Sequence, residues 1–216
     1  MNIENIKNKL KPIIYPIINF VPRRRLKNKD FTIICDNCWA GKVYQELGIP
    51  YQTPFVGLFI FSPDYIKLLS NLDYYLKSGG GQLLRFVRES KYIKEFDNSY
   101  PLALLDDIEI HFLHYKSESE AREKWQRRLA RIHWDNLYFK FNDNDYCSYE
   151  LMKKFDSLPF KSKVIFSSKN YEDLTSLVHF KSREKEGHVG IDLKIYHRYF
   201  NVVNWLNKGG EDLRAD

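Results

Sequence analysis

The sequence "FTIICDNCWAGKVYQELG", residues 31–48, joins two different hydrophobic patterns. Residues 31–35 are mostly β-branched or aromatic, which is typical of a short buried strand. Residues 40–47 place Val43, Tyr44 and Leu47 on one side of a helix, and Gly48 is a typical residue for a helix end. The stretch therefore predicts a strand, a turn and a helix, which is the repeating unit of a parallel α/β sheet.

The rest of the chain repeats this alternation of strands and helices. Apolar runs predict strands at 55–61, 137–141 and 163–167 and near Val178. Amphipathic patterns predict helices that begin at Ser62 and that span 118–133, 149–155 and 196–206. We therefore expect one Rossmann-like α/β domain over residues 31–216, in which α/β/α layers enclose a mainly parallel sheet with right-handed crossovers.

Capping signals mark two of the predicted helix starts. Ser62 is a favourable cap and is followed by proline at the first helical position, and Ser117 forms a capping-box pair with Glu120. Between these starts, "SGGGQ" at 78–82 lacks the Lys-Ser/Thr of a phosphate-binding loop. We expect it to be a mobile loop, followed by a poorly patterned polar stretch up to residue 100.

The basic excess of the chain lies in its first 30 residues. The formal net charge is +6 for 216 residues, and residues 1–30 hold eight basic and two acidic side chains, so the rest is neutral overall. A nucleic-acid-binding domain carries its basic excess on the folded surface, so we expect no nucleic-acid partner. Residues 1–30 also contain the apolar run "IIYPIINFV" and form a basic amphipathic segment. Contact with an anionic membrane surface or a solvated lead-in helix would explain this segment.

Composition limits the class of protein. A hydrophobic content of 44% with 16% aromatic residues is enough for a buried core and excludes a disordered chain. Three cysteines without a secretory signal do not form a disulfide framework, which favours a reducing compartment. No apolar run approaches the roughly 18 residues that a membrane span needs. We therefore expect a cytoplasmic protein, peripheral on the inner membrane face if residues 1–30 bind lipid.

The turn "CDNCWAG" at 35–41 is the first candidate site. The chain has one further cysteine, so a structural zinc site would need histidines from elsewhere, and both zinc and redox chemistry are disfavoured here. Cys38 falls where strand gives way to helix, and free N–H groups there bind anions and lower a thiol pKa. We expect Cys38 to be a catalytic residue, with Asn37, Trp39 and Gly41 as ligand contacts. The alternative is a turn whose Cys38 and Trp39 pack inward.

The second candidate is "DDIEIHFLHY", residues 106–115. Asp107, Glu109 and His111 alternate with apolar residues, which predicts a strand with one polar face. Carboxylates beside imidazoles suit general acid–base catalysis or metal binding, so we expect these three residues to be catalytic and His114 to contact ligand. The alternative is that they form the solvated side of a sheet.

The third candidate is the predicted helix in "EKWQRRLARIHWDN". Arg127 and Arg131 lie on one flank and Arg128 lies at the edge of the apolar stripe, an arrangement that suits a phosphate group. The alternative is that these side chains complement the helix dipole and pair with nearby glutamates. Asp135 and Asn136 follow as further ligand-contact candidates. A buried Arg128 needs a partner, for which Asp107 or Asp135 is expected.

A fourth signal is Asp143-Asn144-Asp145, which follows an apolar strand. It is similar to the Asp-x-Asp with which many glycosyltransferases hold a divalent metal and a sugar nucleotide. An Asx-rich turn explains the same tripeptide. We therefore leave the roles of Asp143 and Asp145 open and assign no metal ligand.

Five segments, taken together, resemble a bacterial family of domain-of-unknown-function proteins often labelled exopolysaccharide or capsular polysaccharide biosynthesis. They are "TIICDNCWAG", "YQTPFVGLFI", "DIEIHFLHY", "EAREKWQRRLARIHWDNL" and "FDSLPFKSKVIF", between about residues 31 and 168. The family turn reads Ser/Asn-Asn-Cys-Trp-Gly-Gly, whereas Ala40 replaces its first glycine here and leaves less room for a phosphate. The Asp-x-Asp is not a fixed part of the family pattern.

The resemblance implies a role in cell-surface glycan biosynthesis. The candidate residues favour a transferase, glycosyl or acyl, that acts on an activated sugar or a sugar hydroxyl, with an activated sugar or another phosphate-bearing donor as ligand. A divalent metal with a sugar nucleotide is the cofactor that such chemistry suggests. The alternative is a non-catalytic, membrane-peripheral component of a polysaccharide assembly complex, bound to lipid through residues 1–30.

Overall fold

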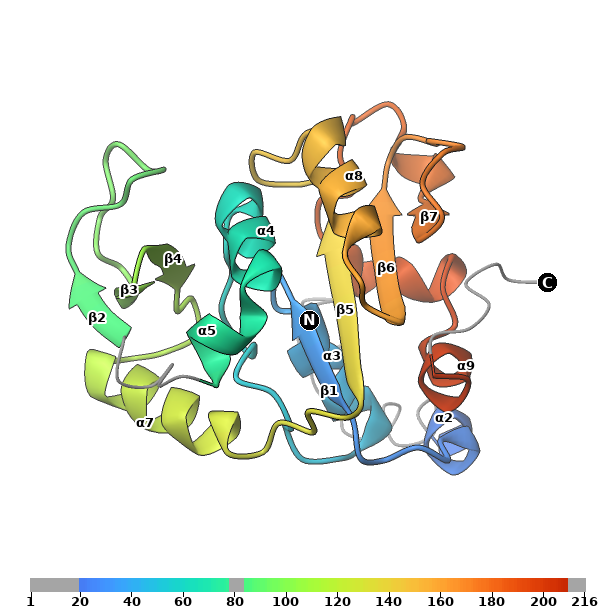
Figure 1. Cartoon of the computed structure of the whole chain (residues 1–216), viewed down its shortest axis with the longest axis horizontal. Coiled ribbons are helices and arrows are strands. Elements are labelled where there is room, and N and C mark those ends of the chain that lie inside the picture. The colour runs from blue at the N-terminus through green and yellow to red at the C-terminus, as the bar shows by residue number, and fades with distance from the viewer. Residues whose placement is uncertain (1–19, 78–83, 210–216) are drawn as a thin grey trace, which may run out of the picture.

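A computed structural model describes residues 20–77 and 84–209 of the chain. They form a mixed α/β structure with a four-stranded parallel sheet and a separate three-stranded antiparallel sheet (Figure 1). The prediction of an α/β fold with a parallel sheet is confirmed at this level. The loop expected at 78–82 lies outside the described residues.

The parallel sheet has the order β1-β5-β6-β7. Its strands are β1 (Thr32–Cys35), β5 (Leu137–Asn142), β6 (Ser162–Ser167) and β7 (Leu177–His179). Their register pairs Cys35 with Lys140 and Lys140 with Val164, so these three residues lie on one face of the sheet. Nearly every residue of β1, β5 and β6 is buried, as expected for a parallel sheet covered on both sides.

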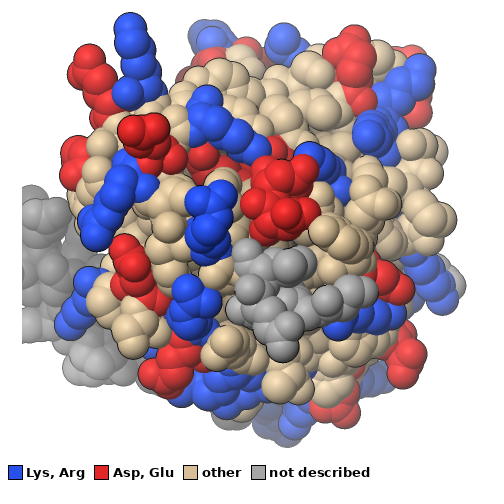
Figure 2. All heavy atoms as spheres, turned by 60° about the vertical axis from the view of Figure 1, so that its left-hand side comes forward, with Lys and Arg blue, Asp and Glu red and all other residues tan. Residues whose placement is uncertain are grey.

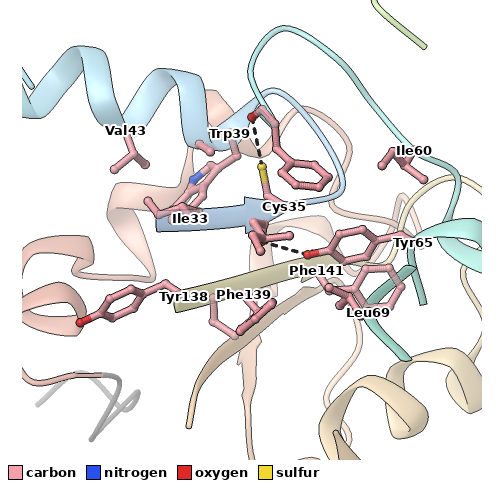
Figure 3. Close-up of a cluster of buried hydrophobic side chains, with 14 of the residues drawn as sticks. Ile33, Cys35, Trp39, Val43, Ile60, Tyr65, Leu69, Tyr138, Phe139 and Phe141 are labelled. Carbon is pink, nitrogen blue, oxygen red and sulfur yellow. Dashed lines mark hydrogen bonds between the residues drawn. The ribbon is translucent and has the colours of Figure 1, made fainter. Parts of the chain in front are cut away.

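Helices pack against both faces of this sheet. Figure 3 shows Trp39 and Val43 of α3 (Trp39–Leu47) on one side of β1. On the other side lie Tyr65 and Leu69 of α4 (Ser62–Ser70), next to α8 (Tyr149–Ser157). The Tyr65 hydroxyl lies 2.9 Å from the Ile34 carbonyl oxygen and 3.0 Å from that of Lys140, so this buried tyrosine links α4 to both β1 and β5.

The helices at the two ends of the described chain pack beside α3. In α2 (Phe20–Arg25), the Arg23 guanidinium donates to the Glu46 carbonyl at 2.9 Å, near the end of α3. In α9 (Val202–Asn207), the Asn207 side chain accepts from the Lys27 N–H at 2.8 Å. Residues 20–30 of the basic segment therefore pack on the domain. Residues 1–19 lie outside the described part, and a domain boundary at residue 31 stays a prediction.

The antiparallel sheet lies within the long connection between β1 and β5. Its order is β2 (Leu84–Val87), β3 (Leu102–Leu105) and β4 (Ile108–His111), and α5 (Leu72–Leu76) precedes it. The β3–β4 turn has Asp106 in the left-handed region, with φ 57°. The following helix, α7 (Glu118–Leu129), begins with the predicted Ser117 cap, whose hydroxyl accepts from the Glu120 N–H. Its Trp125 is fully buried.

Several local predictions were wrong. Residues 55–61 do not form a strand, because only Phe59 pairs, in an isolated antiparallel bridge with His111. Ser62 is the first residue of α4 and Phe61 is its cap, while the Ser62 hydroxyl donates to the Asn144 carbonyl. The helix at 196–206 is divided into the 3₁₀ turn η3 (Tyr196–Arg198) and α9. The stretch at 84–87, which was expected to be polar and without a clear pattern, is β2.

Two further 3₁₀ turns, η1 (Lys181–Arg183) and η2 (Asp192–Lys194), follow β7. Figure 2 shows the face turned toward the small sheet and α7, where Lys and Arg side chains are interspersed with Asp and Glu. Ion pairs such as Lys67–Asp107 and Arg127–Glu123 are consistent with this mixture. Among the described residues, no helix has the length and apolarity needed to cross a bilayer.

Candidate functional site

Three buried ionic side chains lie at the carboxyl end of β1. Lys140 on β5 is fully buried, and its Nζ lies 3.1 Å from Asp36 Oδ1 and 2.5 Å from Asp192 Oδ2. The amide groups of Asn37 and Asn142 also donate to Asp192 Oδ2, at 3.0 and 3.4 Å. The Lys140 cluster, which we define as Asp36, Lys140 and Asp192, joins β1, β5 and η2.

Burial sets the protonation of this cluster. It raises the pKa of Asp36 to about 7, although the Lys140 charge partly offsets the increase. The carboxylates of Asp192 and Asp36 outweigh the burial of Lys140 and raise the pKa of its ammonium above its ordinary value. Lys140 is therefore charged, and Asp36 titrates near neutral pH.

Cys38 is the cap residue of α3 and is half-buried. Burial raises the pKa of its thiol to about 11, and the Asp192 carboxylate adds to this increase. The Sγ atom lies 3.6 Å from the Leu58 carbonyl oxygen. The position at the helix start is as predicted, but burial and the nearby Asp192 carboxylate keep the thiol protonated at neutral pH.

Cys38 lines an open cavity of about 380 Å³, which we call the Arg128 pocket. The cavity lies between α3, the 51–57 loop, the residues that follow β4, and α7. It is lined by Cys38, Gly41, Lys42, Gln45, Tyr51, Val56, Gly57, His114, Tyr115, Lys124, Arg128 and Leu193. Three lysine or arginine side chains and one histidine are among these residues, and no Asp or Glu is. Lys42 and Lys124 each form an ion pair with a glutamate outside the lining, Glu46 and Glu120, so the positive charge at the cavity is concentrated on Arg128.

Arg128 is the most buried cation of this pocket, with 7% of its surface exposed. Its Nη1 donates to the Tyr115 hydroxyl at 2.6 Å, and its guanidinium lies over the Tyr51 ring, 5.0 Å from the ring centre. Within residues 20–77 and 84–209, no carboxylate lies within ion-pair distance of Arg128. The expectation that Asp107 or Asp135 pairs with Arg128 was therefore wrong, because Tyr115 and Tyr51 are the side chains beside its guanidinium.

The structure brings four of the predicted site residues together around this pocket: Cys38, Gly41, His114 and Arg128. Gly41 also allows close packing, since a Cβ atom there would lie 3.1 Å from Val56 Cγ1. An ion pair of 2.5 Å with Glu120 fixes the position of Lys124 in the pocket lining. The functional roles of these residues stay predictions.

Two residues of the same turn point away from the pocket. Trp39 is fully buried and packs against aromatic rings that include Phe166 and Trp205. Asn37 stabilises the turn, because its Oδ1 accepts from the Trp39 N–H at 3.0 Å while its Nδ2 holds Asp192. The inward packing of Trp39 is the alternative that the sequence left open.

The three predicted catalytic residues of the β3–β4 hairpin lie outside the pocket. Asp107 is in the turn, where it pairs with Lys67 and accepts from the Tyr75 hydroxyl at 2.8 Å. Glu109 and His111 are buried, with 2.6 Å between Glu109 Oε1 and His111 Nε2. They do not form the solvated side of the sheet, because the 88–101 loop and Phe59 cover them.

Hydrogen bonds explain the burial of Glu109. Its carboxylate accepts from the Ser90 hydroxyl at 2.6 Å and from the Lys91 N–H at 2.8 Å. Burial alone would raise the pKa of Glu109, but the hydrogen bonds from His111, Ser90 and Lys91 outweigh it and lower the pKa. On the other side of the imidazole, Nδ1 of His111 lies 3.1 Å from the Tyr100 hydroxyl.

The remaining predicted contacts are distributed along and after α7. Arg127 is exposed and pairs with Glu123 at 3.1 Å, while Arg131 reaches the Tyr51 carbonyl at 3.4 Å. Asp135 is exposed. Asn136 donates to the Asp30 carbonyl at 2.5 Å, so it joins the segment before β1 to the start of β5.

Asp143 and Asn144 connect β5 to two other segments. Asp143 Oδ2 accepts from the Ser168 N–H at 2.6 Å, and its Oδ1 accepts from the Val189 N–H at 2.7 Å. Both carboxylate oxygens therefore accept from backbone N–H groups that are distant in the sequence, so Asp143 links the end of β5 to the segments at 168 and 189. Asn144 exchanges hydrogen bonds of 2.8 Å with the N–H and carbonyl of Gly190.

Sequence reasoning missed Lys140, Asp36, Asp192 and the two pocket tyrosines. Lys140 interrupts the apolar strand "LYFKF", and a charged residue in such a strand is a signal that a buried partner is required. Asp192 gave no comparable signal. It lies in an irregular loop, and only the fold places it beside Lys140.

Comparison with known proteins identifies a family and a relative. The family model described as "Domain of unknown function (DUF1919)" matches residues 9–207. A Haemophilus influenzae protein named "Uncharacterized protein" is 39% identical over 198 residues, which cover 88% of this chain and 90% of that protein. The resemblance to a bacterial domain-of-unknown-function family is thereby confirmed.

Proposed function

The chain belongs to the family described as Domain of unknown function (DUF1919). From the side chains that line its pockets, we propose that the protein is a transferase of cell-surface glycan assembly. In this proposal the Arg128 pocket binds the phosphate groups of an activated sugar donor. The exopolysaccharide or capsule context comes from the sequence resemblance. The binding assignment comes from the chemistry of the pocket.

The observation that carries the proposal is the state of Arg128. A buried cation is ordinarily paired with a carboxylate, because an uncompensated charge in a low-dielectric site is costly. Here the guanidinium has a tyrosine hydroxyl and an aromatic ring as neighbours and borders an open cavity. An external phosphate would supply the missing anion and accept two parallel hydrogen bonds from the guanidinium.

The surroundings of Arg128 support this assignment. Lys124 and His114 line the same cavity, and each can donate to phosphate oxygens. The start of α3 adds the positive end of a helix dipole. The cavity also lies at the carboxyl end of β1, and ligands of open α/β sheets bind at the carboxyl ends of the strands.

The glycosyl version of the proposal is favoured over the acyl version. A thioester mechanism requires a Cys38 thiolate, and burial raises the pKa of this thiol to about 11. We therefore assign Cys38 to the wall of the donor pocket. A Cys38→Ser variant is expected to retain donor binding and turnover, and loss of turnover in this variant would favour the acyl version.

The test is a thermal-shift screen with uridine diphosphate glucose, inorganic pyrophosphate and acetyl-coenzyme A, each with and without Mg²⁺. A ligand at a hundredfold excess over its dissociation constant stabilises the folded state by about 2.7 kcal/mol, which is easily measured. We expect pyrophosphate and the sugar nucleotide to raise the melting temperature. Failure of every phosphate-bearing probe would contradict the proposal.

Two neighbouring arginines provide a matched control. Arg128→Met and Arg127→Met remove the same charge from adjacent positions of α7, but Arg127 lies outside the pocket and pairs with Glu123. The ligand-induced shift is expected to disappear in Arg128→Met and to persist in Arg127→Met. Equal shifts in both variants would show that the probe binds elsewhere.

The second candidate role is a membrane-peripheral component that binds anionic lipid through residues 1–30. Part of this segment, residues 20–30, packs on the domain, where the Arg23 guanidinium donates to the carbonyl groups of Glu46 and Gln45 in α3. Pelleting of the full chain and of a chain lacking residues 1–19 with phosphatidylserine vesicles tests this role. Loss of pelleting together with retained pyrophosphate binding would show that the segment and the pocket act independently.

A further inference from the structure

A second pocket lies at the carboxyl end of β5, beyond the Asp143 turn. It is an open cavity of about 490 Å³, which we call the Tyr146 pocket. It is lined by Asp143, Asn144, Asp145, Tyr146, Cys147, His188 and Gly190. The donor assignment above uses none of these residues.

Tyr146 presents an aromatic face at this pocket. Its surface is 64% exposed, the highest fraction among the exposed large hydrophobic side chains of the described residues. Its ring centre lies 5.3 Å from that of Phe61 and 5.6 Å from that of Tyr92. Tyr92 is itself fixed, since its hydroxyl donates to Asp64 at 3.0 Å. Contacts with Phe61 and Tyr92 therefore hold the exposed Tyr146 ring in place.

The backbone at Asp145 and Tyr146 adopts an unfavourable left-handed conformation, which contacts with other segments stabilise. Asp145 and Tyr146 are consecutive residues with φ of 49° and 64°, in the left-handed region that disfavours side chains with a Cβ atom. The Ser62 N–H donates to the Asp145 carbonyl at 3.1 Å, and Asn144 is bonded to Gly190 through both ends of its amide. Such enforced positions concentrate at ligand sites.

The polar groups of the pocket lie beside the ring. The Asp145 carboxylate can accept hydrogen bonds from hydroxyl groups, and the His188 imidazole can donate or accept one. Burial raises the pKa of Asp145, and the charges of Lys140 and His188 partly offset this increase. By contrast, the Asp143 carboxylate is already occupied by Ser168 and Val189.

We propose that the Tyr146 pocket is a carbohydrate subsite, in which a pyranose ring packs on Tyr146 while Asp145 and His188 bind its hydroxyl groups. An exposed aromatic ring matches the C–H face of a sugar, and a few convergent polar groups fix its orientation. The assignment of this sugar as the acceptor of the transferase rests on the proposed function. Sugar binding itself does not.

The position of the two pockets supports an acceptor role. One loop contributes to both, because His188 and Gly190 line the Tyr146 pocket while Leu193 lines the Arg128 pocket. Between them, Asp192 is anchored to Lys140. The segment from Gly57 to the start of α4 is shared in the same way, because Gly57 lines the Arg128 pocket and Ser62 forms hydrogen bonds with the 144–145 turn. Donor and acceptor would thus meet at adjacent strand ends.

The test uses neutral methyl glycosides of glucose, galactose, mannose and N-acetylglucosamine, which carry no phosphate. Their binding to the ¹⁵N-labelled full chain is followed by amide chemical shifts at millimolar concentrations. We expect at least one glycoside to shift the amides of residues 144–147 and 188–190. Shifts confined to residues around Arg128, or the absence of shifts with all four glycosides, would overturn the proposal.

The variants separate the ring from the backbone. Tyr146→Asn removes the ring with a residue that tolerates the left-handed region and is expected to weaken binding roughly tenfold, whereas Tyr146→Phe is expected to retain it. Tyr74→Asn removes an exposed tyrosine outside both pockets and serves as the control. Equal affinity in Tyr146→Asn and the control would also overturn the proposal.

The same experiment distinguishes the two proposals. Pyrophosphate is titrated into Tyr146→Asn, which is expected to bind it as the natural chain does. If glycosides shift the Tyr146 pocket while pyrophosphate fails to bind, the donor proposal fails and the carbohydrate subsite remains. If pyrophosphate binds and glycosides do not, the opposite holds.

Discussion

Lys140 and Arg128 are both buried cations near the start of α3, but their surroundings differ. Lys140 is fully buried, and the carboxylates of Asp36 and Asp192 lie within 3.1 Å of its Nζ. Arg128 borders an open cavity and has Tyr115 and Tyr51 as neighbours. A buried charge whose counter-ions are part of the chain holds elements together, whereas one without a counter-ion is suited to an external anion.

The difference between the two cations also explains why the fold tolerates both. The Lys140 cluster fixes η2 to the end of β1 and to β5, and Asn37 and Asn142 donate further hydrogen bonds to Asp192 Oδ2. The aromatic rings around Arg128 stabilise its charge by cation–π contact, and Arg128 also lines an open cavity. Replacing each cation in turn should therefore have opposite consequences for stability and for binding.

The largest effect is expected from Lys140→Met. This change leaves two buried carboxylates facing each other without their cation, and breaking such a buried pair costs about 3–5 kcal/mol. The free energy of unfolding, measured by urea denaturation followed by circular dichroism, should fall by this amount. A loss below about 1 kcal/mol would show that the cluster does not hold the sheet and η2 together.

A smaller effect is expected from the pH dependence of the same cluster. The pKa of Asp36 rises on folding from 3.8 to about 7, so the folded state binds this proton more tightly than the unfolded state. Its contribution to stability is complete below about pH 4 and is lost as the pH rises through about 7. Asp36→Asn should therefore flatten the decline in unfolding free energy between pH 5 and pH 8.

The control for this titration is Asp107→Asn. The hydrogen bond from Lys67 lowers the pKa of Asp107, so its stabilising contribution is present at neutral pH and is lost only as the pH falls below its ordinary value. The slope between pH 5 and pH 8 should be unchanged in this variant. Asp145, whose pKa burial also raises, is retained in both variants. An unchanged slope in Asp36→Asn would contradict the assignment.

The effect of Arg128→Met on the ligand-free chain is expected to be smaller still. The change removes one hydrogen bond to Tyr115, but it also removes a buried charge that has no counter-ion in the part of the chain that the structure describes. The Tyr115 hydroxyl keeps its bond to the Val56 carbonyl at 2.6 Å. We expect a change within about 1 kcal/mol by urea denaturation. Destabilisation as large as that of Lys140→Met would mean that Arg128 is structural.

The smallest effect is expected from Arg127→Met. Arg127 and Glu123 are exposed and form an i,i+4 pair on α7, and substitutions at such surface positions change the unfolding free energy by less than about 0.5 kcal/mol. The urea midpoint should therefore match that of the natural chain. A measurable loss would indicate that charge on this flank of α7 contributes to folding beyond the single pair.

Much of the fold was predictable because it depends on local patterns. The β-branched run before Cys38, the capping box at Ser117 and the apolar stripe with Trp125 are each encoded by nearby residues, and β1, α3 and α7 occur where expected. The antiparallel sheet was not predicted, because β2 is a short strand in a polar stretch and is stabilised by pairing with β3. Local sequence carries little information about such pairing.

The candidate site was predictable only in part. Cys38, Gly41, His114 and Arg128 share one pocket, but Glu109 and His111 carry the same kinds of polar group and lie buried under the 88–101 loop. A period of two assigns residues to a face of a strand, but it does not show which face another segment covers. The 88–101 loop that covers this face is irregular, so no sequence pattern predicted that it would bury Glu109 and His111.

The sequence alone determined the order of the main strands and helices and the position of Cys38 at the start of a helix, because hydrophobic period and capping act over a few residues. The tertiary structure decided which charges meet. Asp36 and Lys140 are 104 positions apart and become partners only when β5 pairs with β1. Among the described residues, Arg128 has Tyr51 and Tyr115 beside it and not a carboxylate, because the fold packs these tyrosines around it. Electrostatic pairing depends on distances of a few ångströms, which the folded chain fixes and local patterns do not encode.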